Sequence, residues 1–278
     1  VCSSDLGVPG VAKTLLARLT ARLIDADFSR VQFTPDLMPS DVLGTTVFNM
    51  KTNGFDFHQG PIFADIVLVD EINRAPAKTQ AALFEVMEER QISIDGTTHR
   101  MGDLYTILAT QNPVEQEGTY KLPEAQLDRF LMKITMDYPS LEEEVNILER
   151  HHTNAALVKL DDITPAITKE ELLSLRAFMN QVFVDRTLLQ YIALIVQQTR
   201  TSKAVYLGAS PRASVAMLQS SKAYALLQGR DFVTPEDIKF VAPYVLQHRL
   251  ILTAEAEMEG YSPVKVTQRL IDKVEVPK

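Results

Sequence analysis

Residues 7–15, with the sequence GVPGVAKTL, have the composition of a phosphate-binding loop that runs into a helix. Glycines let successive backbone N–H groups point at one anion, and the helix N-terminus adds a positive dipole. Lys13 would bind the β- and γ-phosphates of a nucleotide, and the Thr14 hydroxyl would bind Mg²⁺. The usual pattern has a glycine where this chain has Ala12, so a Gly/Pro turn before an ordinary helix is the alternative. The residues expected to bind the nucleotide are Gly7, Val8, Pro9, Gly10, Val11, Ala12, Lys13, Thr14 and Leu15.

Two acidic residues follow a run of four branched apolar residues at positions 66–69. Such a run predicts a strand that is buried on both faces, as in a parallel sheet. Ligands of parallel sheets bind beyond the carboxyl ends of the strands, where Asp70 and Glu71 would lie. Asp70 suits Mg²⁺ coordination, and Glu71 suits the activation of a water molecule that attacks the γ-phosphate. Two solvated acids at the end of a strand are the alternative interpretation.

A second buried strand is predicted over residues 104–110, and the polar residues Gln111 and Asn112 follow it. Asn112 would again lie beyond the carboxyl end of a strand, where its side chain could hold the attacking water or the γ-phosphate. An Asx turn before Pro113 is the alternative explanation for this residue.

Two arginines are candidates for binding an anion. Arg129 lies between apolar residues in the stretch LDRF, so it either forms a structural ion pair with Asp128 or binds an anion. Arg212 falls in the first turn of a helix that Ser210 would cap. A cation there opposes the helix dipole at a cost of a few tenths of a kcal/mol, roughly, unless an anion lies nearby. A bound phosphate would explain Arg212, and a surface arginine is the alternative.

Turn and capping signals predict the remaining elements. Asn53-Gly54 predicts a hairpin within residues 45–60, and Asp95-Gly96 predicts a second one within residues 91–101. The first hairpin carries Phe48, Phe55 and Phe57, which either pack on the domain or contact a partner. From residue 138 onward the pattern is helical, with capping boxes and Pro at first helical positions. We therefore expect an α/β core over residues 1–137 and a helical linker and lid over residues 138–278.

Composition narrows the possible classes of protein. The chain has 278 residues, 46% of them hydrophobic, with a net charge of −8 and a pI near 5.2. The acidic balance argues against broad binding to nucleic acid, and no apolar run is long enough to insert into a membrane. A single cysteine, Cys2, excludes an intrachain disulfide, and no signal peptide is visible. Residues 1–6 look too polar for the buried strand that should precede a phosphate loop, so we expect this first strand to be truncated or the residues to be non-native.

Five motifs in order resemble those of the MoxR group of AAA+ ATPases: GVPGVAKT, IVLVDEINRAP, ILATQNP, LPEAQLDRF and GASPRAS. The resemblance extends from about residue 7 to about residue 262 and includes the Ala12 form of the loop. It implies a P-loop AAA+ core with a parallel sheet, followed by an all-helical lid. It also implies the roles of single residues, which are Walker A for Lys13 and Thr14, Walker B for Asp70 and Glu71, sensor 1 for Asn112, the arginine finger for Arg129 and sensor 2 for Arg212.

The same resemblance implies a function. The resemblance implies a hexameric ring that uses ATP and Mg²⁺. It also implies chaperone-like remodelling, complex assembly or metal insertion, often in partners that carry a von Willebrand factor A domain. A cytoplasmic homo-oligomer is therefore expected. A chelatase-type motor subunit is the nearest alternative. An MCM-like DNA motor is disfavoured by the acidic pI, and a non-hydrolysing nucleotide switch by the intact Asp70-Glu71 pair.

Overall fold

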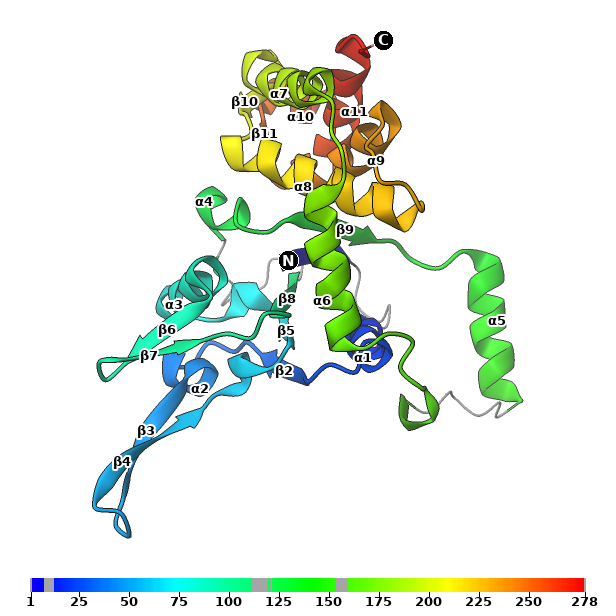
Figure 1. The fold of residues 1–278 in the computed structure, drawn as a ribbon. Helices are drawn as coiled ribbons and strands as arrows, with labels where there is room; N and C mark the ends of the chain where they lie inside the picture. The colour runs from blue at the N-terminus through cyan, green and yellow to red at the C-terminus, as the bar shows by residue number, and fades with distance from the viewer. Residues whose placement is uncertain (1, 8–12, 112–119, 121, 154–159, 278) are drawn as a thin grey trace. The chain divides into compact units, whose positions relative to one another are not determined.

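The computed structural model of the protein describes residues 2–7, 13–111, 120, 122–153 and 160–277 (Figure 1). The chain forms two compact units. The first consists of Val1–Lys121 and Ile134–Leu173, and the second of Leu122–Lys133 and Ser174–Lys278. Because each unit contains two separate segments, no single cut divides the chain, and the domain boundary expected at residue 137 stays a prediction.

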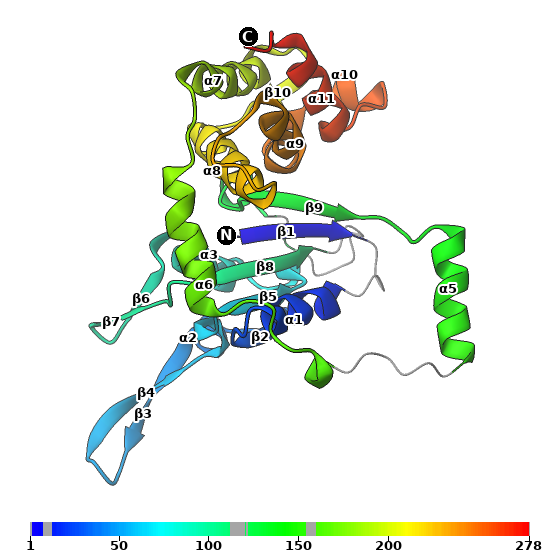
Figure 2. The same cartoon turned by 45° about the vertical axis from the view of Figure 1, so that its right-hand side comes forward.

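The first unit is built on a five-stranded sheet with the strand order β2-β5-β8-β1-β9. The adjacent pairs β2–β5, β5–β8 and β1–β8 are all parallel, which confirms the expected parallel sheet. The apolar run on β5 is buried throughout, as its sequence predicts. The helix α1 (Lys13–Leu23) lies against the sheet, with Ala17 and Ala21 buried (Figure 2). The strands are β1 (Cys2–Gly7), β2 (Phe28–Gln32), β5 (Ile66–Asp70), β8 (Thr106–Gln111) and β9 (Met132–Met136).

The first strand is present although its sequence is polar, and the expectation that residues 1–6 are truncated or non-native stays a prediction. Residues Cys2–Gly7 form β1, which pairs with β8 from Cys2 opposite Ile107 to Leu6 opposite Gln111. The hydrogen bonds of a sheet join backbone groups, so a strand between two others can form without the apolar side chains that a buried strand usually shows. The polar composition of this stretch was therefore a poor guide to its structure.

Both predicted hairpins are present in the first unit (Figure 1). The strands β3 (Gly44–Asn49) and β4 (Gly54–Gln59) pair antiparallel, and Asn53 adopts a left-handed φ of 49° just before β4. The strands β6 (Gln91–Ile94) and β7 (Thr97–Arg100) join through Asp95 and Gly96, whose φ angles of 50° and 78° are those of a tight two-residue turn.

Further helices and 3-10 turns complete the first unit, and two of the helices begin at the capping boxes that the sequence predicts. Ser140 and Glu143 form a capping box at α5, and Thr168 and Glu171 form one at α6. The elements are α2 (Pro39–Leu43), η1 (Pro61–Phe63), η2 (Ile72–Arg74), α3 (Ala77–Glu89), α5 (Leu141–His152), η3 (Leu160–Asp162) and α6 (Lys169–Phe178), the last of which continues into the second unit.

The second unit is mainly helical, as the lid prediction requires. Its core contains fully buried side chains from several helices, among them Tyr191, Ile195, Met217 and Leu246. It also contains a short antiparallel pair of strands that the sequence did not predict, in which Val205 opposes Leu252. The elements are α4 (Glu124–Leu127), η4 (Met179–Gln181), α7 (Arg186–Thr201), β10 (Val205–Leu207), α8 (Pro211–Leu227), α9 (Pro235–Leu246), β11 (Ile251–Leu252), α10 (Ala254–Met258) and α11 (Pro263–Lys273). Among the helices that the structure describes, none combines the length and the apolar character needed to cross a membrane.

Candidate functional site

Three strand ends meet at one edge of the sheet in the first unit. Gly7 ends β1, Asp70 ends β5 and Gln111 ends β8, and these strands are parallel neighbours. Lys13 opens α1, and both it and Thr14 are half-buried. The fold thus brings the end of β5 with Asp70 to the edge where ligands of such sheets bind, next to the ends of β1 and β8. Leu15 is 45% exposed. Val8, Pro9, Gly10, Val11, Ala12 and Asn112 lie outside the described residues, so their expected roles stay predictions.

Asp70 is held by groups on both neighbouring strands. The Thr110 hydroxyl at the end of β8 donates to Asp70 Oδ1 at 2.5 Å and accepts a hydrogen bond from the Glu71 backbone N–H at 3.0 Å. From β2, the Arg30 guanidinium donates to Asp70 Oδ2 at 2.6 Å through Nη2 and at 3.1 Å through Nε. The Asp70 carboxylate therefore has a fixed orientation at the strand end.

Glu71 has an unusual backbone. It adopts the left-handed conformation with φ 56° and ψ 50°, which is uncommon for a residue other than glycine and clusters at functional sites. Its carboxylate Oε2 accepts a hydrogen bond from Gln32 Nε2 at 2.9 Å and pairs with Arg74 Nε at 3.0 Å. These two contacts fix the Glu71 carboxylate beside β2 and the 3-10 turn that follows β5.

A small cavity brings Lys13 close to the same strand ends. It has a volume of about 70 Å³ and is lined by Lys13 and Thr110 together with apolar side chains of α1, the sheet and β9. The cavity is mainly apolar and too small for a nucleotide. Lys13 and Thr110, the threonine that binds Asp70, thus line the same small space.

The donor set of the site fits Mg²⁺ bound together with phosphate. Mg²⁺ prefers hard oxygen ligands and keeps several waters, so it is usually bound by one or two protein oxygens and by substrate phosphates. Asp70 and Thr14 offer a carboxylate and a hydroxyl of this kind. Among the residues that the structure describes, no group of three or more His, Cys, Asp or Glu could form an all-protein metal site. A carboxylate and a hydroxyl are a donor set that suits a metal ion bound together with the phosphates of a nucleotide.

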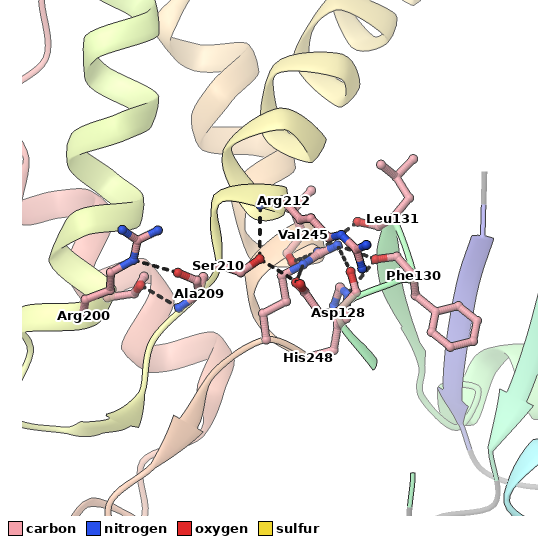
Figure 3. Close-up of polar contacts among 11 residues, drawn as sticks. Asp128, Phe130, Leu131, Arg200, Ala209, Ser210, Arg212, Val245 and His248 are labelled. Carbon is pink, nitrogen blue, oxygen red and sulfur yellow. Dashed lines mark hydrogen bonds and ion pairs between the residues drawn. The ribbon is translucent and has the colours of Figure 1, made fainter. Parts of the chain in front are cut away.

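The two predicted anion-binding arginines both belong to the second unit. Arg212 is in the first turn of α8, whose N-cap Ser210 accepts a hydrogen bond from the Arg212 backbone N–H at 3.1 Å. Arg129 follows α4, next to Asp128. The Asp128 carboxylate accepts a hydrogen bond from Ser210 at 2.7 Å (Figure 3). It also accepts one from Arg249 Nε at 2.8 Å. The structure thus links the segments that carry the two arginines.

Sequence reasoning missed several residues of both units. In the first unit these are Arg30, Gln32, Arg74 and Thr110, which hold the two acids. Polar residues in and just after the predicted strands were the available signal for them, since such residues meet at a sheet edge. In the second unit it missed Gln247, His248 and Arg249. The signal here was three polar residues in a row between the apolar Leu246 and Leu250.

The comparisons with known proteins agree with the geometry. A model of the ATPase family associated with various cellular activities (AAA) matches residues 6–132, and a model of the AAA lid domain matches residues 197–272. The uncharacterized protein YeaC of Bacillus subtilis is 47% identical over 97% of this chain and 83% of its own length. Chaperone MoxR1 of Mycobacterium tuberculosis is 44% identical over 98% of this chain and 73% of its own length.

A solved structure gives the same result for the fold. A crystal structure from Cytophaga hutchinsonii is 41% identical, superposes with a TM-score of 0.90, and is matched over 100% of this chain and 86% of its own. The expected α/β AAA+ core and helical lid are therefore confirmed, and so is the family that the sequence motifs indicated. The chain belongs to the MoxR family of AAA+ ATPases.

Proposed function

We propose that the protein hydrolyses ATP at the interfaces of a homo-oligomeric ring and uses the energy for chaperone-like remodelling of a partner protein. The observation that carries this proposal is the pair Asp70–Glu71 at the carboxyl end of β5, oriented by Thr110 and located near Lys13. This is the combination of groups that phosphoryl transfer to water requires.

Each residue of the first unit has a role in this proposal. Lys13 binds the β- and γ-phosphates together with the backbone of residues 7–12, and Leu15 lies at the nucleotide in the first turn of α1. Thr14 and Asp70 hold Mg²⁺, which neutralises phosphate charge. Glu71 orients the attacking water and accepts its proton, and Asn112 keeps that water in line.

The arginines of the second unit supply positive charge to the transition state. Arg129 acts on the nucleotide of a neighbouring subunit, and Arg212 acts on the nucleotide of its own subunit. An arginine finger is worth roughly 10³–10⁵ in rate, so hydrolysis depends on assembly. A hexamer is the proposed assembly, and the proposed location is the cytoplasm.

The proposed partner is a client or adaptor protein, including proteins with a von Willebrand factor A domain. The name of the relative MoxR1, which describes a chaperone, supports this class of function. The net charge of −8 argues against nucleic acid as the substrate. Complex assembly and metal insertion are two forms that the remodelling could take.

The proposal is tested by the ATPase rate per subunit, measured against protein concentration in the presence of Mg²⁺. The rate should rise steeply with concentration and fall by about 10³-fold or more in Glu71→Gln and in Arg129→Ala. The exposed residues Glu89 and Arg186 provide the controls Glu89→Gln and Arg186→Ala, which should leave the rate unchanged.

Three results would contradict the proposal. A concentration-independent rate that survives Arg129→Ala would remove the shared interface. ATP binding without hydrolysis, including after addition of cell extract as a source of partner, would favour a nucleotide switch. Strong stimulation by DNA would favour a DNA motor.

A further inference from the structure

We propose that Asp128 is a positioning residue that holds the segments of Arg129 and Arg212 in a fixed position relative to each other. Arg249 in turn holds Asp128 in place. The inference rests on the proposed function, which assigns both arginines to ATP hydrolysis. All of the residues that carry it belong to the second unit. Its basis is a chain of contacts from the turn after α9, through Asp128, to the N-terminus of α8.

In the first step, Arg249 donates several hydrogen bonds to the segment that carries Arg129. The Arg249 side chain is only 3% exposed, and its Nε donates to Asp128 Oδ1 at 2.8 Å. Its Nη2 donates to the backbone carbonyls of Asp128 at 3.1 Å and Phe130 at 2.5 Å, on either side of Arg129. Its Nη1 donates to the Leu131 carbonyl at 3.1 Å. A planar guanidinium with this many fixed acceptors leaves the backbone around Arg129 little freedom.

The second step is that the two residues before Arg249 bind the same segment. Gln247 Nε2 donates to the Lys133 carbonyl at 2.6 Å. His248 Nε2 lies 3.1 Å from the Phe130 carbonyl, which can only accept, so this imidazole is protonated at Nε2. Burial is the main cause that lowers the pKa of His248 to about 3, so the ring stays neutral. Three consecutive side chains thus hold the backbone of residues 128–133.

The third step connects this segment to Arg212. Ser210 Oγ donates to Asp128 Oδ2 at 2.7 Å and accepts from the Arg212 backbone N–H at 3.1 Å (Figure 3). On the other side of Ser210, the Ala209 carbonyl accepts a hydrogen bond from Arg200 Nε at 2.9 Å. The two oxygens of one carboxylate therefore join the Arg129 segment to the first turn of α8. A displacement of one should displace the other.

This arrangement makes a specific prediction about Asp128→Asn, which keeps the size of the side chain and removes its charge. Because misplacement of a catalytic group by about 1 Å can cost about 100-fold in rate, we expect kcat to fall about 100-fold. The effect should overlap with those of the arginines it positions. Each double variant, Asp128→Asn with Arg129→Ala or with Arg212→Ala, should lose less than the product of the two single losses, and Asp128→Asn should cause no further loss when both arginines are alanine.

The second unit offers a matched control for the loss of a buried ion pair. Asp237 is 1% exposed and pairs with Arg230 at 2.5 Å, and Thr234 donates to it from its backbone N–H at 2.8 Å. Like Asp128, it accepts from one arginine and from a residue at the N-terminus of a helix. Asp237→Asn should therefore lower the melting temperature as much as Asp128→Asn, or more, while kcat stays near that of the wild type.

A second variant tests the link without removing the charge. Ser210→Gly removes the hydroxyl that joins Asp128 to α8, while glycine is tolerated at an N-cap at a cost of only a few tenths of a kcal/mol. We expect kcat to fall about tenfold or more, and the loss should disappear in the background of Arg212→Ala. This variant also decides the question if Asp128→Asn fails to fold.

The outcomes separate this inference from the proposed function. If Arg129→Ala and Arg212→Ala abolish turnover while folded Asp128→Asn and Ser210→Gly retain the wild-type kcat, the positioning role is wrong and the ATPase proposal stands. Losses that simply multiply in the double variants would also reject positioning. If neither arginine variant affects turnover, the assigned roles of the arginines fail first.

Discussion

At the scale of single residues, Asp70 and Glu71 at the end of β5 are each paired with an arginine. Arg30 lies 2.6 Å from Asp70 Oδ2, and Arg74 lies 3.0 Å from Glu71 Oε2. A cation at Asp70 competes with Mg²⁺ for the same carboxylate. The same contact also orients Asp70, so Arg30 both prepares and opposes the proposed metal site.

We therefore expect Arg30→Gln to lower the concentration of free Mg²⁺ that gives half-maximal ATPase activity. The Arg30 side chain is 48% exposed, so the ion pair is worth at most about 1 kcal/mol, and the shift should be at most about fivefold. The measurement is a Mg²⁺ titration at saturating ATP. Arg30→Lys, which keeps the charge, is the control and should resemble the wild type. An unchanged or higher Mg²⁺ requirement in Arg30→Gln would count against competition at Asp70.

The sequence predicted the acids of the site better than their surroundings. Asp70 and Glu71 follow a recognisable buried strand, so their place at its carboxyl end could be inferred from local pattern. Arg30 and Thr110 are each 40 residues from Asp70, and a single sequence carries little local signal for such contacts. The left-handed backbone of Glu71 was also hidden, because no glycine marks it.

At the scale of elements, the hairpin β3–β4 has a packed base and an exposed end. Phe57 packs against the rings of Phe63 and His99, with ring centroids 5.8 Å and 4.2 Å away. Phe48 and Phe55 contact each other at 5.2 Å and remain 46% and 73% exposed. The sequence left open whether these aromatic residues pack on the domain or contact a partner. Phe57 packs on the domain, and Phe48 and Phe55 are available for a partner.

The base of this hairpin should not tolerate a side chain at Gly60. A Cβ atom there would overlap the Val42 carbonyl oxygen and would lie 2.5 Å from the Gly44 backbone nitrogen. Both are backbone atoms, so Gly60→Ala should lower the free energy of unfolding of the first unit by about 1–3 kcal/mol. Gly54→Ala is the matched control, because its Cβ would meet nothing closer than 3.8 Å. Urea unfolding followed by circular dichroism measures both, and equal stabilities would show that the hairpin base adjusts without strain.

Local signals predicted most elements, and tertiary pairing decided the others. The capping boxes at Ser140 and Thr168 and the two-residue turn at Asp95-Gly96 formed as their residues indicate, because the bonds involved join residues close in sequence. Strand β1 and the pair β10–β11 depend on partners far along the chain. Their own composition carries little of that information.

At the scale of the whole molecule, the second unit contains a buried group that links its stability to pH. Burial and the nearby charges of Arg249 and Lys133 lower the pKa of His248 to about 3, against the opposing effects of the Phe130 carbonyl and Asp128. In the unfolded chain the pKa of His248 returns to its ordinary value of 6.5. Between these values the unfolded chain binds a proton that the folded unit does not, so the free energy of unfolding decreases as the pH falls below 6.5.

Acidification should therefore destabilise the second unit through His248. The loss is about 1.4 kcal/mol for each pH unit below 6.5, or about 2 kcal/mol at pH 5. Asp237, in the same unit, does not contribute in this range. Burial opposes the shift, but the hydrogen bonds from Arg230 and Thr234 lower the pKa of Asp237 below 3.8, so its stabilisation is lost only at more acidic pH.

His248→Gln should remove the pH-dependent part of the stability. The difference in free energy of unfolding between wild type and variant should therefore shrink from pH 7.5 to pH 5. Urea unfolding at the two pH values measures this difference. A difference that stays constant would mean that His248 is charged in the folded protein, or that its contact with the Phe130 carbonyl breaks in acid. Loss of that contact would also loosen the backbone around Arg129.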